Sequence, residues 1–317
     1  MAPTAVTTRA SETVTTLAVV ADYGQSGRRR TRAGSHWLGW FRFSTLTLGA
    51  LVLLLATASS TSAASETAAA GNIVASFHDT GTYYHPRNAR LTISWSGRVI
   101  YSQAVRSKWC ANQCWPDTFV AGKTALHVVR LQAGALPEVV LDLYSGGAHC
   151  CFIDQVFSVV PASLSVRKSE INFGDPGDRL VPIGAGGSSD FLTANDSFAY
   201  AFTDFAASGM PIEVLSFSHY GFHDVTNSFP TLIVTDARKW QEAFRAMASS
   251  HYHDTVGVVA AWAADEDRLR RVAVVSRFLA LEVKAGHLNS AMNPTQRSGE
   301  RYVAELHQFL LQHGYLK

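Results

Sequence analysis

The chain has 317 residues, of which 47% are hydrophobic and 16% are charged, and its formal net charge is +2. This composition excludes an intrinsically disordered protein, which has fewer apolar residues and a larger net charge. The length allows one large domain or two of ordinary size, each with its own core. The nearly neutral charge argues against a nucleic-acid partner, because nucleic-acid-binding proteins normally carry a basic face.

Residues 1–63 have the features of a signal peptide. Five arginines between residues 28 and 42 precede Ser44–Ala58, an uncharged and largely apolar run. That run is shorter than the ~20 residues of a membrane-spanning helix, and small residues follow it. We therefore expect cleavage near Ala63 or Ala64, secretion to the extracellular space and no stable membrane span afterwards. An uncleaved anchor at the cell envelope and a later start codon are the alternatives.

Four cysteines follow the predicted leader, at Cys110, Cys114, Cys150 and Cys151. An even number of cysteines in an exported protein predicts disulfide bonds. Three connectivities are open: each pair closes locally, or the 110/114 loop is joined to the 150/151 turn in either order. A zinc site formed with His149 fits no common ligand spacing.

Residues 72–235 have the pattern of an antiparallel β domain, after a short Ala/Ser-rich lead at 64–71. Short runs of alternating apolar and polar residues are separated by glycine-rich turns, which is typical of a sandwich or of propeller-like blades. The predicted strands include residues 91–95, 98–101, 126–131, 138–144, 152–160, 198–202, 212–217 and 231–234.

Residues 236–317 are predicted to be a helical segment. Asp236 is placed to cap a helix with Trp240, Phe244 and Met247 on its apolar face. Further helices are expected from about Thr255, with a break near Asp265, and from about Glu300. The acids at 265–267 and the arginines at 268, 270 and 271 suggest a solvated helix face with i,i+4 ion pairs. The predicted fold is therefore mainly β, with a C-terminal α-helical segment.

Residues 131–142 and 183–194 form an internal repeat at a shift of 52 residues. Gly134 matches Gly186, and the acidic residue Glu138 matches Asp190, each before a strand. Repeats of about this length are typical of β-propeller blades.

The stretch Pro137–Cys151 (PEVVLDLYSGGAHCC) resembles the FG-GAP/VCBS repeats of integrin-α-like β-propellers, as found in secreted actinobacterial proteins. Residues 197–202 and 211–214 resemble the second half of such a unit. The resemblance implies blade-like units over about residues 90–235. The family's repeat loops hold calcium with aspartates, and at those positions this chain has Arg130, Gln132, Gly134 and Pro182, Gly184, Gly186. We therefore expect neither calcium nor another cofactor.

The turn at residues 145–151 is the sharpest local feature. Asp142, Tyr144, His149 and Asp154 flank it, and we expect them to form a candidate ligand surface. Two roles are open for the turn: a vicinal disulfide could stack against a sugar ring, or the glycines could simply form a tight structural turn.

No complete nucleophile elbow, phosphate loop or dinucleotide fingerprint occurs in the sequence. This favours a secreted, non-catalytic interaction protein with a protein or carbohydrate partner. The alternative is a secreted hydrolase with a site near Asp142 and His149. An enzyme should have a deep pocket lined by polar groups, whereas an interaction protein should expose an apolar patch.

Overall fold

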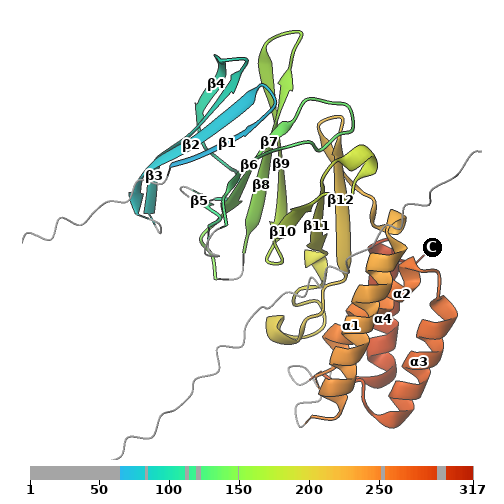
Figure 1. The fold of residues 1–317 in the computed structure, drawn as a ribbon. Helices are drawn as coiled ribbons and strands as arrows, with labels where there is room; N and C mark the ends of the chain where they lie inside the picture. Colours follow the sequence, from blue (N-terminus) through green and yellow to red (C-terminus); the bar gives the residue numbers. More distant parts are fainter. Residues whose placement is uncertain are drawn as a thin grey trace, which may run out of the picture. The chain divides into compact units, whose positions relative to one another are not determined.

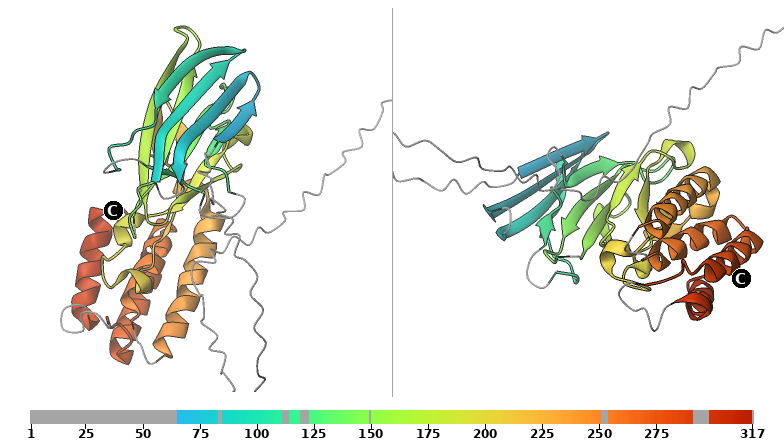
Figure 2. Two further views of the ribbon diagram at one scale, coloured as in Figure 1. Left: turned by 90° about the vertical axis from the view of Figure 1, so that its left-hand side faces the viewer. Right: turned by 90° about the horizontal axis from the view of Figure 1, so that it is seen from below.

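The computed structural model describes residues 65–82, 85–110, 114–118, 123–148, 150–250, 254–290 and 298–316. The predicted signal peptide at 1–63 and His149 lie outside these ranges. The described residues form thirteen strands in three antiparallel sheets and four C-terminal α-helices (Figures 1 and 2). The predicted fold class, mainly β with a helical C-terminal segment, is confirmed.

The first sheet begins earlier than predicted. Its strands run in the order β1 (Ser65–Ala70), β2 (Ile73–Thr82), β3 (His85–Trp95) and β4 (Arg98–Ala104). The expected lead at 64–71 is thus wrong, because Ser65–Ala70 pairs with β2 as an edge strand. Glu66 fixes this strand by accepting the N–H groups of Ala125 and Leu126, at 2.8 and 2.9 Å.

The second sheet is covered on both faces. Its central strands alternate between a core shared with the first sheet, which includes Val139 and Leu141, and a core shared with the third sheet, which includes Val140. Every residue of β7 is buried as a result. The strands are β5 (Trp115–Pro116) and β6 (Leu126–Val129), which both pair with β7 (Glu138–Tyr144), followed by β8 (Phe152–Val160) and β9 (Ser165–Gly174).

The third sheet is also antiparallel. Its strands are hydrogen-bonded in the order β10 (Asp178–Val181), β11 (Asp190–Ala194), β12 (Ile212–Ser218) and β13 (Gly221–Asp224). Phe191 and Phe217 pack with Val140 and Val156 of the second sheet. Three sheets therefore stack face to face, as the sandwich or blade prediction requires.

The two copies of the sequence repeat lie at corresponding places in the second and third sheets. Gly134 and Gly186 both have positive φ, at 73° and 64°, which a glycine adopts without steric cost. The two loops also touch, because the N–H of Ser189 donates to the carbonyl of Arg130 at 2.8 Å. In the first copy, buried Glu138 accepts the N–H of Leu131 at 3.0 Å and so holds the loop to its strand.

The helical segment comprises α1 (Pro230–Ala248), α2 (Val256–Arg268), α3 (Val272–Ala285) and α4 (Gly299–Gln312). The strand predicted at 231–234 is wrong, because Pro230 occupies the first turn of α1 and Ile233, Ala237 and Phe244 form its buried face. Asp236 consequently lies inside the helix rather than capping it.

Residues 198–202 also differ from the prediction. Phe198 ends a 3₁₀ turn and residues 199–202 continue without a strand, while Phe198 and Phe202 pack against the rings of Phe309 and Tyr302. This segment therefore belongs to the core of the helical part.

The helix α2 is the centre of that core, since every residue from Val256 to Asp267 is buried. Gly257 lets the neighbouring loop approach closely, because a Cβ there would clash with the carbonyl oxygen of Ala207. The chain turns at residues 269–271 before α3, close to the break expected near Asp265. Within the described ranges, no helix is long and apolar enough to cross a membrane.

Candidate functional site

The structure brings together three of the four residues of the predicted ligand surface. Asp142 and Tyr144 lie on the same face of β7, and Asp154 of β8 is paired directly opposite Asp142. They are nevertheless buried, with exposed fractions of 8%, 9% and 1% for Asp142, Tyr144 and Asp154. That face of the second sheet is turned toward the third sheet. His149 lies outside the described residues.

An aromatic rung lies next to the two aspartates in the sheet. Trp115, Tyr144 and Phe152 occupy paired positions on β5, β7 and β8. Their ring centroids are 6.1 Å apart for Trp115 and Tyr144, and 4.9 Å apart for Tyr144 and Phe152. These rings contribute to excluding water from Asp142 and Asp154.

Two basic side chains, Lys123 and His127, lie between Asp142 and the surface. Lys123 forms an ion pair with Asp117 and its Nζ lies 3.9 Å from Oδ2 of Asp142. His127 Nε2 lies 3.1 Å from the same oxygen. Burial would lower the pKa of His127, but the hydrogen bond and charge of Asp142 outweigh it and raise the pKa. The side chains of Lys123 and His127 are 28% and 29% exposed.

A carboxyl pair lies deeper, between the second and third sheets. Burial raises the pKa of both Asp154 and Asp178 well above the usual range, and the two groups hydrogen-bond to each other. Carboxyl groups this close share a proton rather than ionise together. The Oδ1 of Asp142 and the Oδ2 of Asp154 are buried without a hydrogen-bond partner in the described part of the chain.

We call these residues the carboxyl cluster: Asp117, Asp142, Asp154 and Asp178, with Lys123 and His127. Four acids lie close together in it, so their negative charges must be neutralised. Lys123 and the shared proton neutralise acids that would otherwise repel one another. Among the described residues, no three His, Cys, Asp or Glu side chains are arranged to hold a metal ion. Nothing in the spacing of the other four residues links them to Asp142, so their place in the cluster could not be predicted from the sequence: Asp117, Lys123, His127 and Asp178.

The four cysteines form two local disulfides. Cys110 is bonded to Cys114, and Cys150 to Cys151. Of the three open connectivities, the two that join the loop to the turn are therefore excluded. The turn is held by its own backbone, since Ser145 N–H donates to Cys151 O at 3.0 Å. Gly147 is required there, because a Cβ would clash with the carbonyl oxygen of Cys150.

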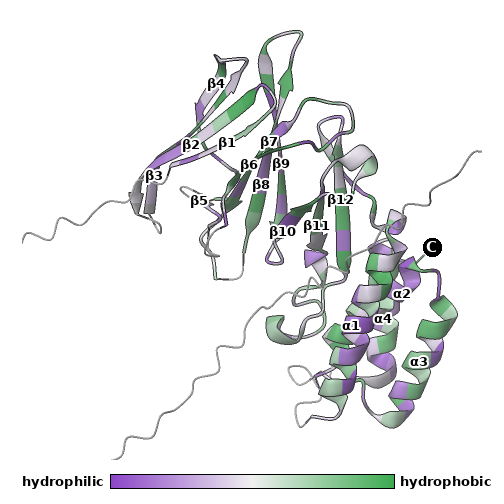
Figure 3. Ribbon diagram, viewed as in Figure 1, coloured by the Kyte–Doolittle hydropathy of each residue, from purple (hydrophilic) through white to green (hydrophobic). Residues whose placement is uncertain are grey.

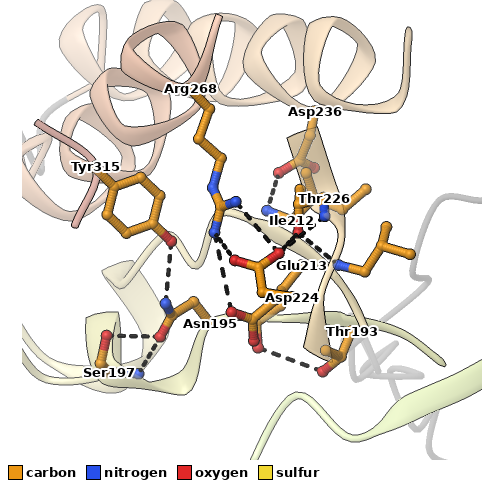
Figure 4. A network of polar contacts seen from close by, with 12 residues as sticks. Thr193, Asn195, Ser197, Ile212, Glu213, Asp224, Thr226, Asp236, Arg268 and Tyr315 are labelled. Atoms are coloured by element: carbon orange, nitrogen blue, oxygen red, sulfur yellow. Dashed lines mark hydrogen bonds and ion pairs between the residues drawn. The ribbon is translucent and has the colours of Figure 1, made fainter. Parts of the chain in front are cut away.

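A second polar network joins the third sheet to the helices (Figure 4). Arg268 of α2 donates to Asp224 of β13 at 3.0 Å, lies 4.0 Å from Glu213 of β12, and stacks 4.7 Å from the ring centre of Tyr315. Burial would raise the pKa of Asp224, but hydrogen bonds from Thr226 and Arg268 outweigh it and lower the pKa.

The solvated helix face expected at residues 265–271 is wrong for residues 265–268, whereas Arg270 and Arg271 are exposed. Asp265, Glu266 and Asp267 are buried, and the side chain of Arg268 is only 9% exposed. The ion pair that forms is Glu266 with Arg271, at 3.2 Å, instead of the i,i+4 pairs. The apolar run at 256–264 could have shown this, because a helix that is apolar on all sides is a buried helix.

An apolar groove lies between α3 and α4, with a volume of about 360 Å³. Large exposed apolar side chains occur on the same two helices, at Val274, Leu281 and Leu311. Figure 3 shows hydrophobic residues along much of α3. The residues lining the groove are mostly apolar: Val272, Val275, Leu279, Ala280, Val283, Val303, Leu306, Leu310 and Leu316, with Asp267, Ser276, Lys284, Glu300 and His307 among them.

Comparison with known proteins gives one distant relative. The chain is similar to the uncharacterized protein y4bJ of Sinorhizobium fredii, with 24% identity over 129 residues. The match covers 40% of this chain and 19% of that protein, so the chain spans about a fifth of its relative's length. No family model and no solved structure matches the chain.

Proposed function

We propose that this chain is a secreted, non-catalytic interaction protein that binds a protein partner through its helical segment. The observation that carries the proposal is the mostly apolar groove between α3 and α4, whose lining includes Val272, a side chain that is 45% exposed. Apolar surface of this kind on a folded protein is typical of a binding site. The carboxyl cluster, by contrast, lies mainly between two packed sheets.

Three further observations support the extracellular assignment and the FG-GAP/VCBS-like interpretation of the β part. Cleavage at Ala63 or Ala64 would leave β1 complete, since that strand begins at Ser65. Two disulfides suit an oxidising compartment. The repeated strand–loop units of the second and third sheets also occupy corresponding positions, as blades would.

The test compares two arginine substitutions in an affinity-capture experiment. Ala280→Arg places a charge in the groove, whereas Val99→Arg changes another exposed position, on β4 of the first sheet. We expect wild-type protein and Val99→Arg to retain a common partner from culture supernatant and envelope extracts, and Ala280→Arg to lose it. Identical capture by all three proteins, or no specific capture by any, contradicts the proposal.

One observation favours a second candidate function, hydrolysis. Asp154 and Asp178 form a carboxyl pair with raised pKa values beside Asp142 and Lys123, and such groups are typical of acid–base sites. The test is a panel of glycoside and peptide substrates with Asp154→Asn, using Asp190→Asn as the buried control. Turnover lost only in Asp154→Asn would support hydrolysis, and no turnover by the wild-type protein would exclude it for that panel.

A further inference from the structure

The outward side of α3 carries alternating cationic and apolar residues. Val274, Arg277, Leu281 and Lys284 follow one another at spacings of three and four residues, and we call them the α3 stripe. Val274 and Leu281 are 50% and 55% exposed, and the two cations are exposed as well. Neither of these cations takes part in an ion pair within the described part of the chain. Residues at this spacing lie on one side of a helix.

Lys284, the last residue of the stripe, lines the groove on its α3 side, and the groove has the dimensions of a helix-binding site. Its lining extends from Val272 to Lys284 on α3, and from Glu300 to Leu310 on α4. At 1.5 Å per residue these walls are about 18 and 15 Å long. A guest helix of about three turns fits that length, with apolar anchors at positions i, i+4 and i+7.

We propose that the groove binds an amphipathic helix of a partner protein, with an acidic flank that faces the α3 stripe. The inference rests on the proposed function and adds the chemistry of the partner. The guest's apolar anchors would contact Ala280, Val283 and Val303, and its carboxylates would lie beside Arg277 and Lys284. Lys284 on the α3 wall and Arg277 two turns before it select an acidic flank on that side, because like charges across an interface are unfavourable. The acids that line the groove, Asp267 and Glu300, lie on α2 and at the start of α4.

Two other occupants fit less well. A second copy paired through α3 would bring Arg277 and Lys284 of the two chains together, which is repulsive. An anionic membrane would satisfy the cations, but its surface is flat and would leave the 360 Å³ groove unfilled. A convex helix ridge both fills the groove and meets the charges.

The experiment uses the full chain and three synthetic helical peptides of equal length. The first has leucines at i, i+4 and i+7 with glutamates on one flank. The second replaces the glutamates by lysines, and the third keeps the composition of the first but scatters the leucines. Fluorescence anisotropy measures each Kd against wild-type protein, Ala280→Arg and the double variant Arg277→Glu/Lys284→Glu. Arg87→Glu/Arg98→Glu, on exposed residues of the first sheet, is the matched charge control.

We expect the glutamate peptide to bind wild-type protein at least tenfold more tightly than either other peptide. Ala280→Arg should weaken that binding tenfold or more, Arg277→Glu/Lys284→Glu should reverse the preference toward the lysine peptide, and Arg87→Glu/Arg98→Glu should change nothing. Equal binding of the glutamate and lysine peptides overturns the inference. The inference is also overturned if no peptide binds and wild-type protein instead binds phosphatidylglycerol vesicles, or self-associates, in a way that Ala280→Arg abolishes.

The two proposals fail in distinguishable ways. If Ala280→Arg loses a natural partner in the capture experiment but no peptide binds, the interaction function stands and the acidic-helix inference is wrong. If Ala280→Arg changes neither capture nor peptide binding, both are wrong. Circular dichroism of each variant checks that its fold is retained.

Discussion

The guanidinium of Arg268 on α2 donates to the carboxylate of Asp224 on β13, with Nη2 and Oδ2 3.0 Å apart. This contact joins the central helix of the helical segment to the edge strand of the third sheet. Arg268 also lies beside Glu213 and stacks on Tyr315. A single side chain therefore contacts two strands and a residue near the C-terminal end of the chain. The two parts are therefore held together by a polar junction as well as by apolar packing.

Replacing Arg268 by alanine should destabilise the protein, because Asp224 and Glu213 lose their counter-ion. Removing one partner of a buried pair costs 3–5 kcal/mol, but the side chain of Asp224 is 42% exposed, so we expect about 1–3 kcal/mol. Urea unfolding measures the change. A double-mutant cycle with Asp224→Asn should give a coupling of roughly 0.5–2 kcal/mol, and strictly additive effects would show that the contact contributes nothing.

Asp267 should make the protein less stable as the pH rises. Burial and the charge of Glu266 raise its pKa from 3.8 to about 7. A carboxyl whose pKa is higher in the folded state binds its proton more tightly there, so folding is favoured below pH 4 and the benefit disappears as the pH rises to 7. A pKa shift of this size corresponds to a change of roughly 4 kcal/mol in the free energy of unfolding, at 1.36 kcal/mol per pKa unit. Partial hydration of the carboxyl group reduces the expected change to about 1–3 kcal/mol.

Asp267→Asn cannot ionise and should remove this part of the pH dependence. Thermal unfolding of wild-type protein and variant at pH 4.5, 6 and 8 tests it. The variant should gain stability relative to wild-type protein at pH 8 and not at pH 4.5. If the Tm difference between the variant and wild-type protein is the same at all three pH values, Asp267 ionises in the folded protein without a cost in stability.

The sequence predicts those parts of the fold that local patterns determine. The alternation at 91–95 and 98–101 corresponds to β3 and β4, and the apolar run at 138–144 to β7. Three of the four residues at 231–234 are β-branched and favour a strand, yet α1 begins at Pro230 and includes them, because its buried face continues through Ala237 and Phe244. Ser65–Ala70 has almost no apolar pattern and becomes a strand only because β2 and β6 are beside it.

The candidate sites depend still more on tertiary packing. Alternation along β7 and a short turn suffice to bring Asp142, Tyr144 and Asp154 together. Their burial does not follow from the sequence, because it arises from the third sheet, whose position local patterns do not encode. The same holds for Arg268, whose partners are 44 and 55 residues away at Asp224 and Glu213.

Gly257→Ala should destabilise the protein although alanine is the better helix former. In an exposed helix the change would gain about 1 kcal/mol. In α2 the new Cβ would clash with the carbonyl oxygen of Ala207 and lie 2.9 Å from Cα of Ser208. Such overpacking costs about 1–3 kcal/mol, so we expect a lower Tm and a lower urea midpoint. A higher Tm would mean that the 203–209 loop can move away from α2 without cost.

The disulfide pattern and the predicted leader are tested together by mass spectrometry of protein from culture supernatant. The structure gives Cys110–Cys114 and Cys150–Cys151, so peptide mapping without reductant should give no peptide that links the two regions. The intact mass should begin near Ala64 and lie four hydrogens below the reduced value. Because Cys110–Cys114 closes a loop of only five residues, Cys110→Ser/Cys114→Ser should cost about 2 kcal/mol on the chain-entropy account. A cross-linked peptide would contradict the local pairing, whereas an intact leader with free thiols would contradict secretion and favour an anchored protein.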